Sequence, residues 1–306
     1  MRTSILRSWL NGWIDKISMR DFLIRGVAGR AKLRFALCRS TNAVFQAVVY
    51  HDADPVAAEL IGDAVTGAAL SSVLLGEGEK LSIRWEYPGA AGITLADVNF
   101  AGDIRCCPGN PHLLGEVKSR ADLFGVGDGN IAVTRSSDGR ILNSGQSAAP
   151  LADLSLDLAF FYSVSDQVES GIKSIVELSP DPVKPVKTAG GLLIQALPDC
   201  DLEEFEEVRR RLESAELEEV LSRDVLGVDV WVREVLEALL KADFGDSEIS
   251  YSYGADIGLR CSCSEEKMAS ALKLLRPEEL EAAWSGRDEL TVQCQFCGRR
   301  YTLRRR

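Results

Sequence analysis

Cys261-Ser262-Cys263 and, thirty residues further on, Cys294-Gln295-Phe296-Cys297-Gly298 decide how the C-terminal part of this 306-residue chain folds. Two close pairs of thiolates supply the four ligands of a tetrahedral zinc shell. Gly298 follows the second pair, where a tight knuckle can turn backbone N–H groups toward sulfur. The motifs therefore predict a zinc site with the ligands Cys261, Cys263, Cys294 and Cys297.

The segment between the two motifs is predicted to be helical, because apolar residues recur at helical spacing. These residues are Met268, Leu272, Leu275 and, beyond Pro277, Leu280 and Trp284. Such a module has little apolar surface to bury, so metal binding would supply most of its folding free energy, about 10–16 kcal/mol in zinc-finger peptides. We expect a zinc-binding domain over residues 255–306, with Zn²⁺ as its cofactor.

The same four thiolates leave two interpretations open. Oxidation would destroy the zinc shell and loosen the domain, and a Cys-X-Cys disulfide closes a tight ring that is comparatively easily reduced, as a reversible sensor requires. Nearby cations favour the reactive thiolate, namely Arg260, Lys267, Arg299 and Arg300. The alternative is a permanent structural zinc site that senses nothing.

Residues 20–198 have the pattern of one α+β core domain. Asp54-Pro55 is a helix start, and the apolar residues 56–75 predict a buried helix that ends at Gly76. A second helix is predicted over residues 154–168, and Asp138-Gly139 predicts a hairpin turn. Strands are predicted at residues 80–87, 93–100, 131–135, 141–144, 172–178 and 192–197. Because helices and strands do not alternate regularly, we expect a largely antiparallel sheet with helices packed against it.

Residues 199–254 are predicted to be a helical linker. Residues 201–224 carry ten acidic side chains and four arginines around a narrow apolar stripe, which predicts a charged helix that is marginal without a partner surface. A second helix is predicted over residues 230–242. The alternative is an ordinary two-helix appendage of the core.

Composition narrows the class of protein. The net charge of −11 disfavours a nucleic-acid partner, and no apolar run is long enough to cross a bilayer, so no membrane partner is expected. Residues 1–19 form an N-terminal extension that lacks the apolar core of a signal peptide. It predicts an amphipathic helix that packs Trp9 and Trp13, or alternatively an organellar transit peptide. We expect a cytoplasmic protein, in which eight cysteines indicate metal or redox chemistry rather than a disulfide framework.

The cysteine spacing, together with motifs in the core, resembles the heat-shock protein 33 family of redox-regulated holdase chaperones. Residues 189–198 read Ala-Gly-Gly-Leu-Leu-Ile-Gln-Ala-Leu-Pro, similar to that family's A-G-G-x-L-x-Q-x-x-P segment. Ser165-Asp166-Gln167 resembles its S-[ED]-Q element, and the run from Ala57 to Leu75 resembles its long early helix. The resemblance covers roughly residues 20–303.

The resemblance implies the following mechanism. Oxidation would join Cys261 to Cys263 and Cys294 to Cys297, release zinc and unfold the zinc module and linker. Exposed apolar surface would then bind unfolding client proteins without ATP, as a homodimer and without catalytic residues. The core, residues 20–198, would be the substrate-binding and dimerisation domain. The chain departs from the family's G-D-G-P-like turn at residues 87–92 and from its V-R-G-Y-like segment at residues 104–107.

Two other classes of protein compete with this prediction. A constitutive zinc ribbon that binds nucleic acid or protein is supported by Arg304-Arg305-Arg306, and a thiol–disulfide enzyme would use Cys294 and Cys297.

The remaining cysteines and both histidines are not expected to form a site. Cys106 and Cys107 are predicted to be ordinary thiols in a strand rather than a vicinal disulfide, Cys38 and Cys200 core or linker thiols, and His51 and His112 lie far from the motifs in sequence.

Overall fold

The computed structural model of the chain describes residues 20–225, 227–241 and 248–305. The expectations for residues 1–19 lie outside these. At its centre is the helix predicted after Asp54-Pro55, α3 (Pro55–Ser71), which continues as a 3₁₀ turn, η2 (Ser72–Leu74). The Asp54 side chain accepts a hydrogen bond from the Ala57 backbone N–H and so caps α3 as predicted.

The stretch from Pro55 to Leu74 is long and apolar enough to cross a membrane by length and composition. The expectation that no such run exists is therefore wrong. However, 78% of its most apolar window is buried inside the protein. This burial identifies α3 as a core helix, because the buried helix of a large core is apolar on every side.

On one side of α3 lies a six-stranded sheet with the order β11-β5-β4-β3-β6-β7. Its strands are β3 (Glu79–Glu86), β4 (Ile93–Asn99), β5 (Asp103–Cys107), β6 (Gly129–Ser137), β7 (Arg140–Ala149) and β11 (Gly258–Leu259). Asp138 and Gly139, which join β6 to β7, both have positive φ, 49° and 76°. The predicted hairpin is thus confirmed, with the backbone that the right-handed twist of two strands favours.

On the other side lies a five-stranded sheet with the order β10-β1-β2-β9-β8. Its strands are β1 (Phe22–Ala28), β2 (Leu33–Arg39), β8 (Ser170–Leu178), β9 (Val186–Ala196) and β10 (Ile249–Asp256). Every strand pair in the two sheets is antiparallel except β11 with β5. The prediction of a largely antiparallel α+β fold is confirmed, but the core contains two large sheets rather than one.

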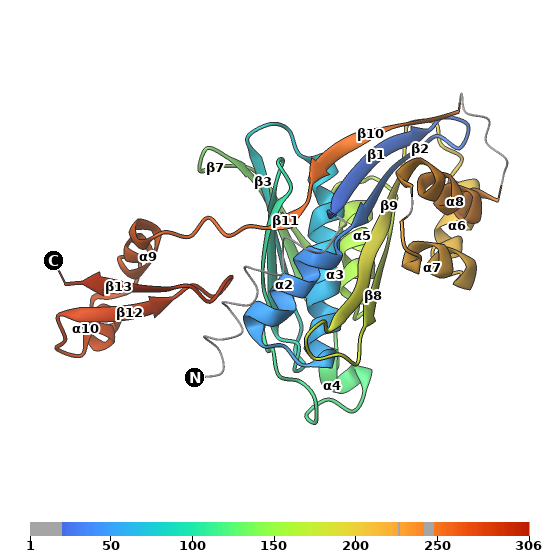
Figure 1. Cartoon of the computed structure of the whole chain (residues 1–306). Coiled ribbons are helices and arrows are strands. Elements are labelled where there is room, and N and C mark those ends of the chain that lie inside the picture. Colours follow the sequence, from blue (N-terminus) through green and yellow to red (C-terminus); the bar gives the residue numbers. More distant parts are fainter. Residues whose placement is uncertain (1–19, 226, 242–247, 306) are drawn as a thin grey trace.

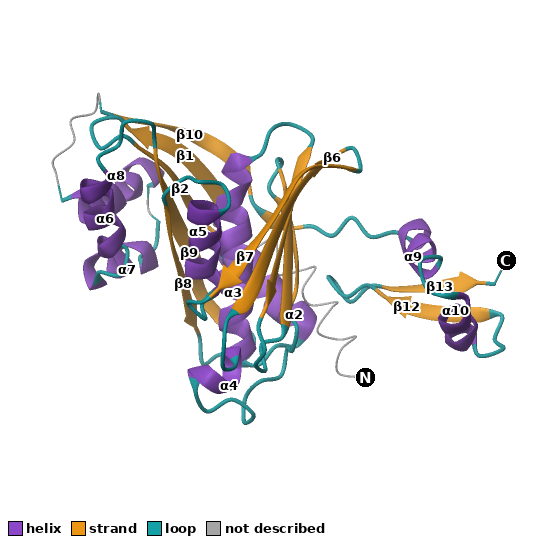
Figure 2. Cartoon of the chain, turned by 180° about the vertical axis from the view of Figure 1, so that it is seen from behind, coloured by secondary structure: helices purple, strands orange, loops and turns teal. Residues whose placement is uncertain are grey.

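Helices fill the space between the two sheets (Figure 2). α2 (Thr41–His51) and α5 (Leu154–Val164) accompany α3 there, and the short α4 (Arg120–Phe124) lies at one end. α5 ends earlier than the predicted residue 168, because the chain turns at Gln167, which has a left-handed φ of 56°, before it enters β8. The interior is closely packed; Trp85 of β3, for example, is fully buried and donates to the Leu154 carbonyl oxygen at 3.0 Å.

The charged segment after the core packs on the outer face of the five-stranded sheet (Figure 1). It forms α6 (Leu202–Arg211), α7 (Ala215–Ser222) and α8 (Val228–Leu240). The single helix predicted over residues 201–224 is wrong, because the chain breaks before Ser214, whose side chain caps α7. The helix predicted over residues 230–242 is confirmed as α8. Residues 249–254 of the predicted linker belong to β10, which pairs with β1.

The C-terminal module extends from the body at the end of β11 (Figure 1). It contains α9 (Glu265–Leu272), α10 (Pro277–Trp284), β12 (Glu289–Gln293) and β13 (Arg300–Arg304). The predicted helical segment between the cysteine motifs is thus confirmed. β12 and β13 form a two-stranded antiparallel sheet, and the loop that joins them faces the body.

Candidate metal centre

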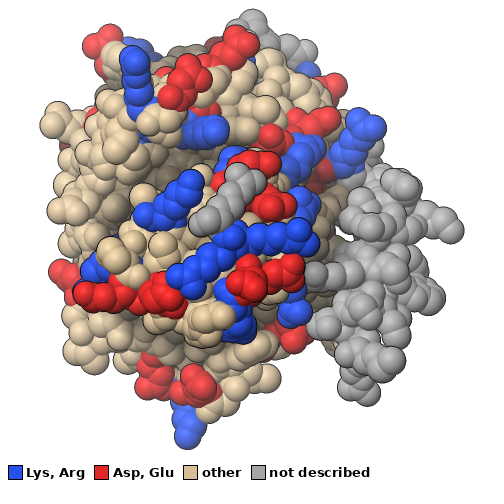
Figure 3. Space-filling view, turned by 90° about the vertical axis from the view of Figure 1, so that its left-hand side faces the viewer, with Lys and Arg blue, Asp and Glu red and all other residues tan. Residues whose placement is uncertain are grey.

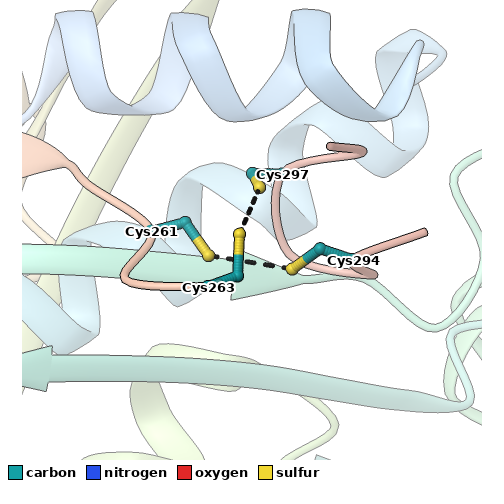
Figure 4. Close-up of side chains that lie close together, drawn as sticks. All are labelled: Cys261, Cys263, Cys294 and Cys297. Carbon is teal, nitrogen blue, oxygen red and sulfur yellow. Dashed lines mark hydrogen bonds between the residues drawn. The ribbon is translucent and has the colours of Figure 1, made fainter. Parts of the chain in front are cut away.

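The two cysteine motifs occupy loops that face each other (Figure 4). Cys261 and Cys263 lie between β11 and α9, and Cys294 and Cys297 lie in the knuckle between β12 and β13. The knuckle is closed by two backbone hydrogen bonds, from Cys294 N to Arg299 O at 2.9 Å and from Gly298 N to Cys294 O at 2.8 Å. Gly298 has a φ of 65°, in the left-handed region that glycine adopts without strain.

All four sulfur atoms lie within 4.8 Å of one another. The Sγ atoms of Cys261 and Cys294 are 3.7 Å apart, and those of Cys263 and Cys297 are 3.5 Å apart. A tetrahedral metal with metal–sulfur bonds of about 2.3 Å places its sulfur ligands about 3.8 Å apart. The structure therefore brings the four predicted cysteines into a shell of the size that one thiolate-bound metal ion requires.

Hydrogen bonds around Cys263 favour its thiolate form. Its Sγ lies 3.1 Å from the Tyr301 hydroxyl, and the single proton of that hydroxyl is within reach of both this sulfur and the Cys263 carbonyl oxygen, at 3.0 Å. Burial acts to raise the pKa of Cys263, but the hydrogen bonds from Tyr301 and Cys297 outweigh it and lower the pKa to about 7. Burial raises the pKa of Cys261 and of Cys297. A bound cation would hold all four sulfurs as thiolates.

The cations expected around the cysteines have different roles. Arg299 lies close enough to Cys263 and Cys297 for their charges to interact. Arg260 instead pairs with Asp103 of β5 at 2.7 Å, and Lys267 donates to the Ser262 hydroxyl at 3.1 Å. Arg105, which was not predicted from the sequence, lies beside Cys261, and its charge also interacts with that cysteine.

Arg105 and His51 of the core both contact the knuckle at Phe296. The guanidinium of Arg105, in β5, lies 4.1 Å from the ring centre of Phe296 and pairs with Asp97 at 2.6 Å. On the same strand, the Cys106 carbonyl oxygen lies 3.0 Å from Nε2 of His51. Burial lowers the pKa of His51, while hydrogen bonds to the backbone of Cys106 and Phe296 act to raise it. These contacts could not be predicted from the sequence, because Arg105 and His51 lie far from the cysteine motifs along the chain. The signal that the sequence did contain was the unusual Ile104-Arg105-Cys106-Cys107 segment.

The other cysteines are free thiols outside the metal group, although Cys107 lies close enough to Cys294 for their charges to interact. Cys106 and Cys107 lie in β5 as predicted. Burial raises the pKa of Cys106 and that of Cys38, the latter to about 12, so neither thiol is reactive at neutral pH. Cys200 is half-buried beside the Ala31 carbonyl oxygen. His51 and His112 are likewise absent from the metal group among the described residues.

Comparison with known proteins agrees with this architecture. The chain matches the model of the family described as "Hsp33 protein" over residues 21–304. It is 28% identical over 289 residues to the 33 kDa chaperonin of Bacillus cytotoxicus, covering 92% of this chain and 95% of the relative. The 33 kDa chaperonin of Bacillus cereus strain AH187 is also 28% identical, over 287 residues, with the same coverage.

A solved structure has the same fold. The crystal structure of the 33 kDa chaperonin from Thermotoga maritima superposes with a TM-score of 0.76 and 23% sequence identity, covering 94% of this chain and 95% of that chain. The family match spans nearly the whole of the described chain, and the cysteine cluster lies inside it. The chain therefore belongs to the Hsp33 family.

Proposed function

We propose that this chain is a redox-regulated, ATP-independent holdase of the cytoplasm. Membership of the Hsp33 family supports a chaperone function. The proposed redox regulation is supported by one observation above all. Four sulfurs lie within 4.8 Å of one another in a module that has almost no hydrophobic core of its own. Beyond Ile257, the buried side chains of the described residues are only those of Cys263, Trp284, Cys294 and Leu303. Two of these are ligand candidates, so the fold of the module depends on the metal.

We assign the metal as zinc, held by Cys261, Cys263, Cys294 and Cys297, because four thiolates in a closed tetrahedral shell suit a structural zinc ion. When bound, zinc neutralises the thiolates and joins the loop after β11 to the knuckle. Tyr301 orients Cys263, and Arg105 holds the knuckle against β5 through Phe296. The protein's own contribution is thus to hold the sulfurs in place and to attach the module to the core.

Oxidation would dismantle this shell. Two thiolates that reduce one hydrogen peroxide form one S–S bond; the O–O bond breaks, and two protons are taken up to give two molecules of water. The family resemblance implies the pairs Cys261–Cys263 and Cys294–Cys297. In the reduced arrangement, sulfurs of different motifs also lie within 3.7 Å of each other, so mapping of the disulfide-linked peptides is the direct test of these pairs.

The linker covers the surface that we assign to clients. α6, α7 and α8 shield an apolar sheet face that includes Phe22, Ile24, Phe35, Leu37 and Leu192. α6 attaches through a narrow apolar stripe of Phe205 and Val208 and is highly charged elsewhere, whereas α8 attaches through a broad apolar face. Both need the sheet as a partner surface, as expected of a segment that is stable only while docked. β10 continues from the linker into β11 and the zinc module, so collapse of the module would remove the anchor of the linker. Release would also leave apolar surface through which two copies can associate as a homodimer.

The alternative classes of protein find less support. Of the C-terminal run Arg304-Arg305-Arg306 that would contact nucleic acid, Arg304 pairs with Glu289 at 3.1 Å and Arg305 pairs with Glu281, while Arg306 lies outside the described residues. Figure 3 shows acidic and basic side chains interspersed on the face that carries this end of the chain. A thioredoxin-like enzyme places Cys-x-x-C at a helix start, whereas Cys294 and Cys297 lie between two strands.

Comparing the reduced and oxidised chain in three measurements separates the three classes of protein. The reduced, zinc-loaded chain and the peroxide-treated chain are each mixed with a thermally unfolding enzyme, and light scattering follows aggregation. A holdase suppresses scattering only after oxidation. A ribbon binds its partner only in the zinc-loaded state, and an oxidoreductase turns over a disulfide substrate catalytically. Equal scattering with both forms of the chain would contradict the proposal.

A further inference from the structure

Arg39 is a buried cation on the apolar sheet face beneath the linker. It ends β2 on the face that carries Phe35 and Leu37, pairs across the sheet with Phe22, and is only 4% exposed. A guanidinium in such a place requires compensation, because burying an unpaired charge is costly. Among the described residues, Arg39 forms no ion pair, and its Nε has no hydrogen-bond partner.

The linker provides most of the compensation that Arg39 does receive. Nη2 donates to the Arg223 carbonyl oxygen after α7 at 2.7 Å, and the guanidinium lies 5.2 Å from the ring centre of Trp231 in α8. The third contact, from Nη1 to the Thr188 hydroxyl at 2.5 Å, stays within the sheet. Undocking of the linker therefore removes an oxygen acceptor and an aromatic face from Arg39.

The acidic groups of the core that lie near Arg39 are already engaged. Asp21 accepts hydrogen bonds from the backbones of Asn42 and Ala43, and Glu177 pairs with Lys187 at 2.7 Å. The released sheet face would thus present an apolar surface with two cations that lose linker partners. Lys173 of β8 loses Glu213 and Glu218 but is partly exposed to water, whereas Arg39 is buried, and its Nε and Nη2 both become available to an acceptor.

We infer that the client surface prefers unfolded segments in which a carboxylate side chain lies close to an aromatic residue within an apolar sequence. A carboxylate can accept from Nε and Nη2 together, which is the strong two-bond geometry of arginine. The aromatic residue would take the place of Trp231 over the guanidinium. In the closed state, the linker itself occupies the site with a carbonyl oxygen and an indole. This inference rests on the proposed holdase function and specifies its client chemistry.

The test uses two fluorescent peptides that alternate Leu and Ser around one Trp and differ only in an Asp or an Asn near that Trp. Anisotropy measures their binding to the oxidised full-length chain. A charge-assisted pair replaces a neutral hydrogen bond in the Asp peptide, so we expect it to bind about tenfold more tightly. Arg39→Gln should remove this preference but leave binding of the Asn peptide nearly unchanged.

Controls separate this inference from the proposed function. Arg25→Gln removes an exposed cation of β1 outside the apolar face and should keep the preference for Asp. Arg39→Lys keeps the charge without the two-bond geometry and should weaken the preference. Equal binding of both peptides to the wild-type chain would overturn the inference while the holdase function stands. Binding of neither peptide would overturn both.

Discussion

Trp231 is the side chain whose removal should most directly separate linker docking from zinc binding. It lies in α8, is 3% exposed, and packs edge-on against Phe22 with ring centres 5.8 Å apart. Its indole N–H donates to the Val220 carbonyl oxygen at 3.1 Å. Truncating a buried tryptophan to alanine costs about 3–5 kcal/mol, because packing is lost and a cavity remains.

Trp231→Ala should therefore shift the linker toward the undocked state by about two to four powers of ten, since each 1.4 kcal/mol is a factor of ten. We expect the reduced variant to suppress aggregation without oxidant and to be cleaved faster by protease within residues 199–248. Its zinc content should stay at the wild-type level, because Trp231 contributes nothing to the cysteine shell.

Val230→Ala is the matched control, one residue away on the same helix and 61% exposed. It should change neither activity nor cleavage. If reduced Trp231→Ala stays inactive and the linker resists protease as it does in the wild-type chain, then linker docking does not keep the chaperone closed. If zinc is lost along with docking, then the linker and the module are not separable as described here.

Three further predictions address the site and the fold. Cys294→Ser removes one of four ligands, so bound zinc per chain should fall and holdase activity should appear without oxidant; retained zinc with no activity would contradict the assignment. Burial raises the pKa of Asp21 to about 7, so the folded state binds this proton more tightly than the unfolded chain does. Stability should then fall as pH rises from about 4 to about 7, and Asp21→Asn should flatten the pH dependence of urea midpoints; an unchanged slope would refute this. In Gly62→Ala a new Cβ would lie 2.4 Å from Cγ2 of Val176, so overpacking should lower the unfolding free energy by about 1–3 kcal/mol, and an unchanged melting temperature would contradict this packing.

Local chemistry made several elements predictable from the sequence. Asp54-Pro55 starts α3, and Asp138-Gly139 turns β6 into β7, because each needs only the residues of one turn. The same holds for the knuckle at Gly298, whose hydrogen bonds join residues close in sequence. In each case, neighbouring side chains and backbone groups suffice to determine the conformation.

Elements whose conformation depends on packing between distant parts of the chain could not be predicted from the sequence. In β2, Ala36 and Cys38 face the interior between the sheets while Phe35 and Leu37 face the linker, so both faces are apolar and no alternation marks the strand. β10 pairs with β1 across more than two hundred residues, a partnership that no local pattern encodes. The broken linker helix was missed because its apolar stripe continues across the break before Ser214.

The cysteines of the site were visible as motifs, but their surroundings were not. Two close pairs of cysteines have the spacing of zinc ligands, and this spacing alone predicted that all four sulfurs meet at one site. Arg105, by contrast, reaches Phe296 from a strand of the core, and Tyr301 reaches Cys263 from β13. The Arg105 contact depends on the pairing of β11 with β5, which places the module beside the core, whereas the Tyr301 contact arises within the module.

The most direct test of the redox switch measures bound zinc and aggregation suppression on the same sample, before oxidation, after peroxide with mild heat, and after reductant with added zinc. The proposed mechanism predicts that one zinc per chain is lost as holdase activity appears, and that both changes reverse together. Zinc that stays bound under oxidant, or zinc that leaves without any holdase activity, would contradict the switch and leave a structural zinc module in its place.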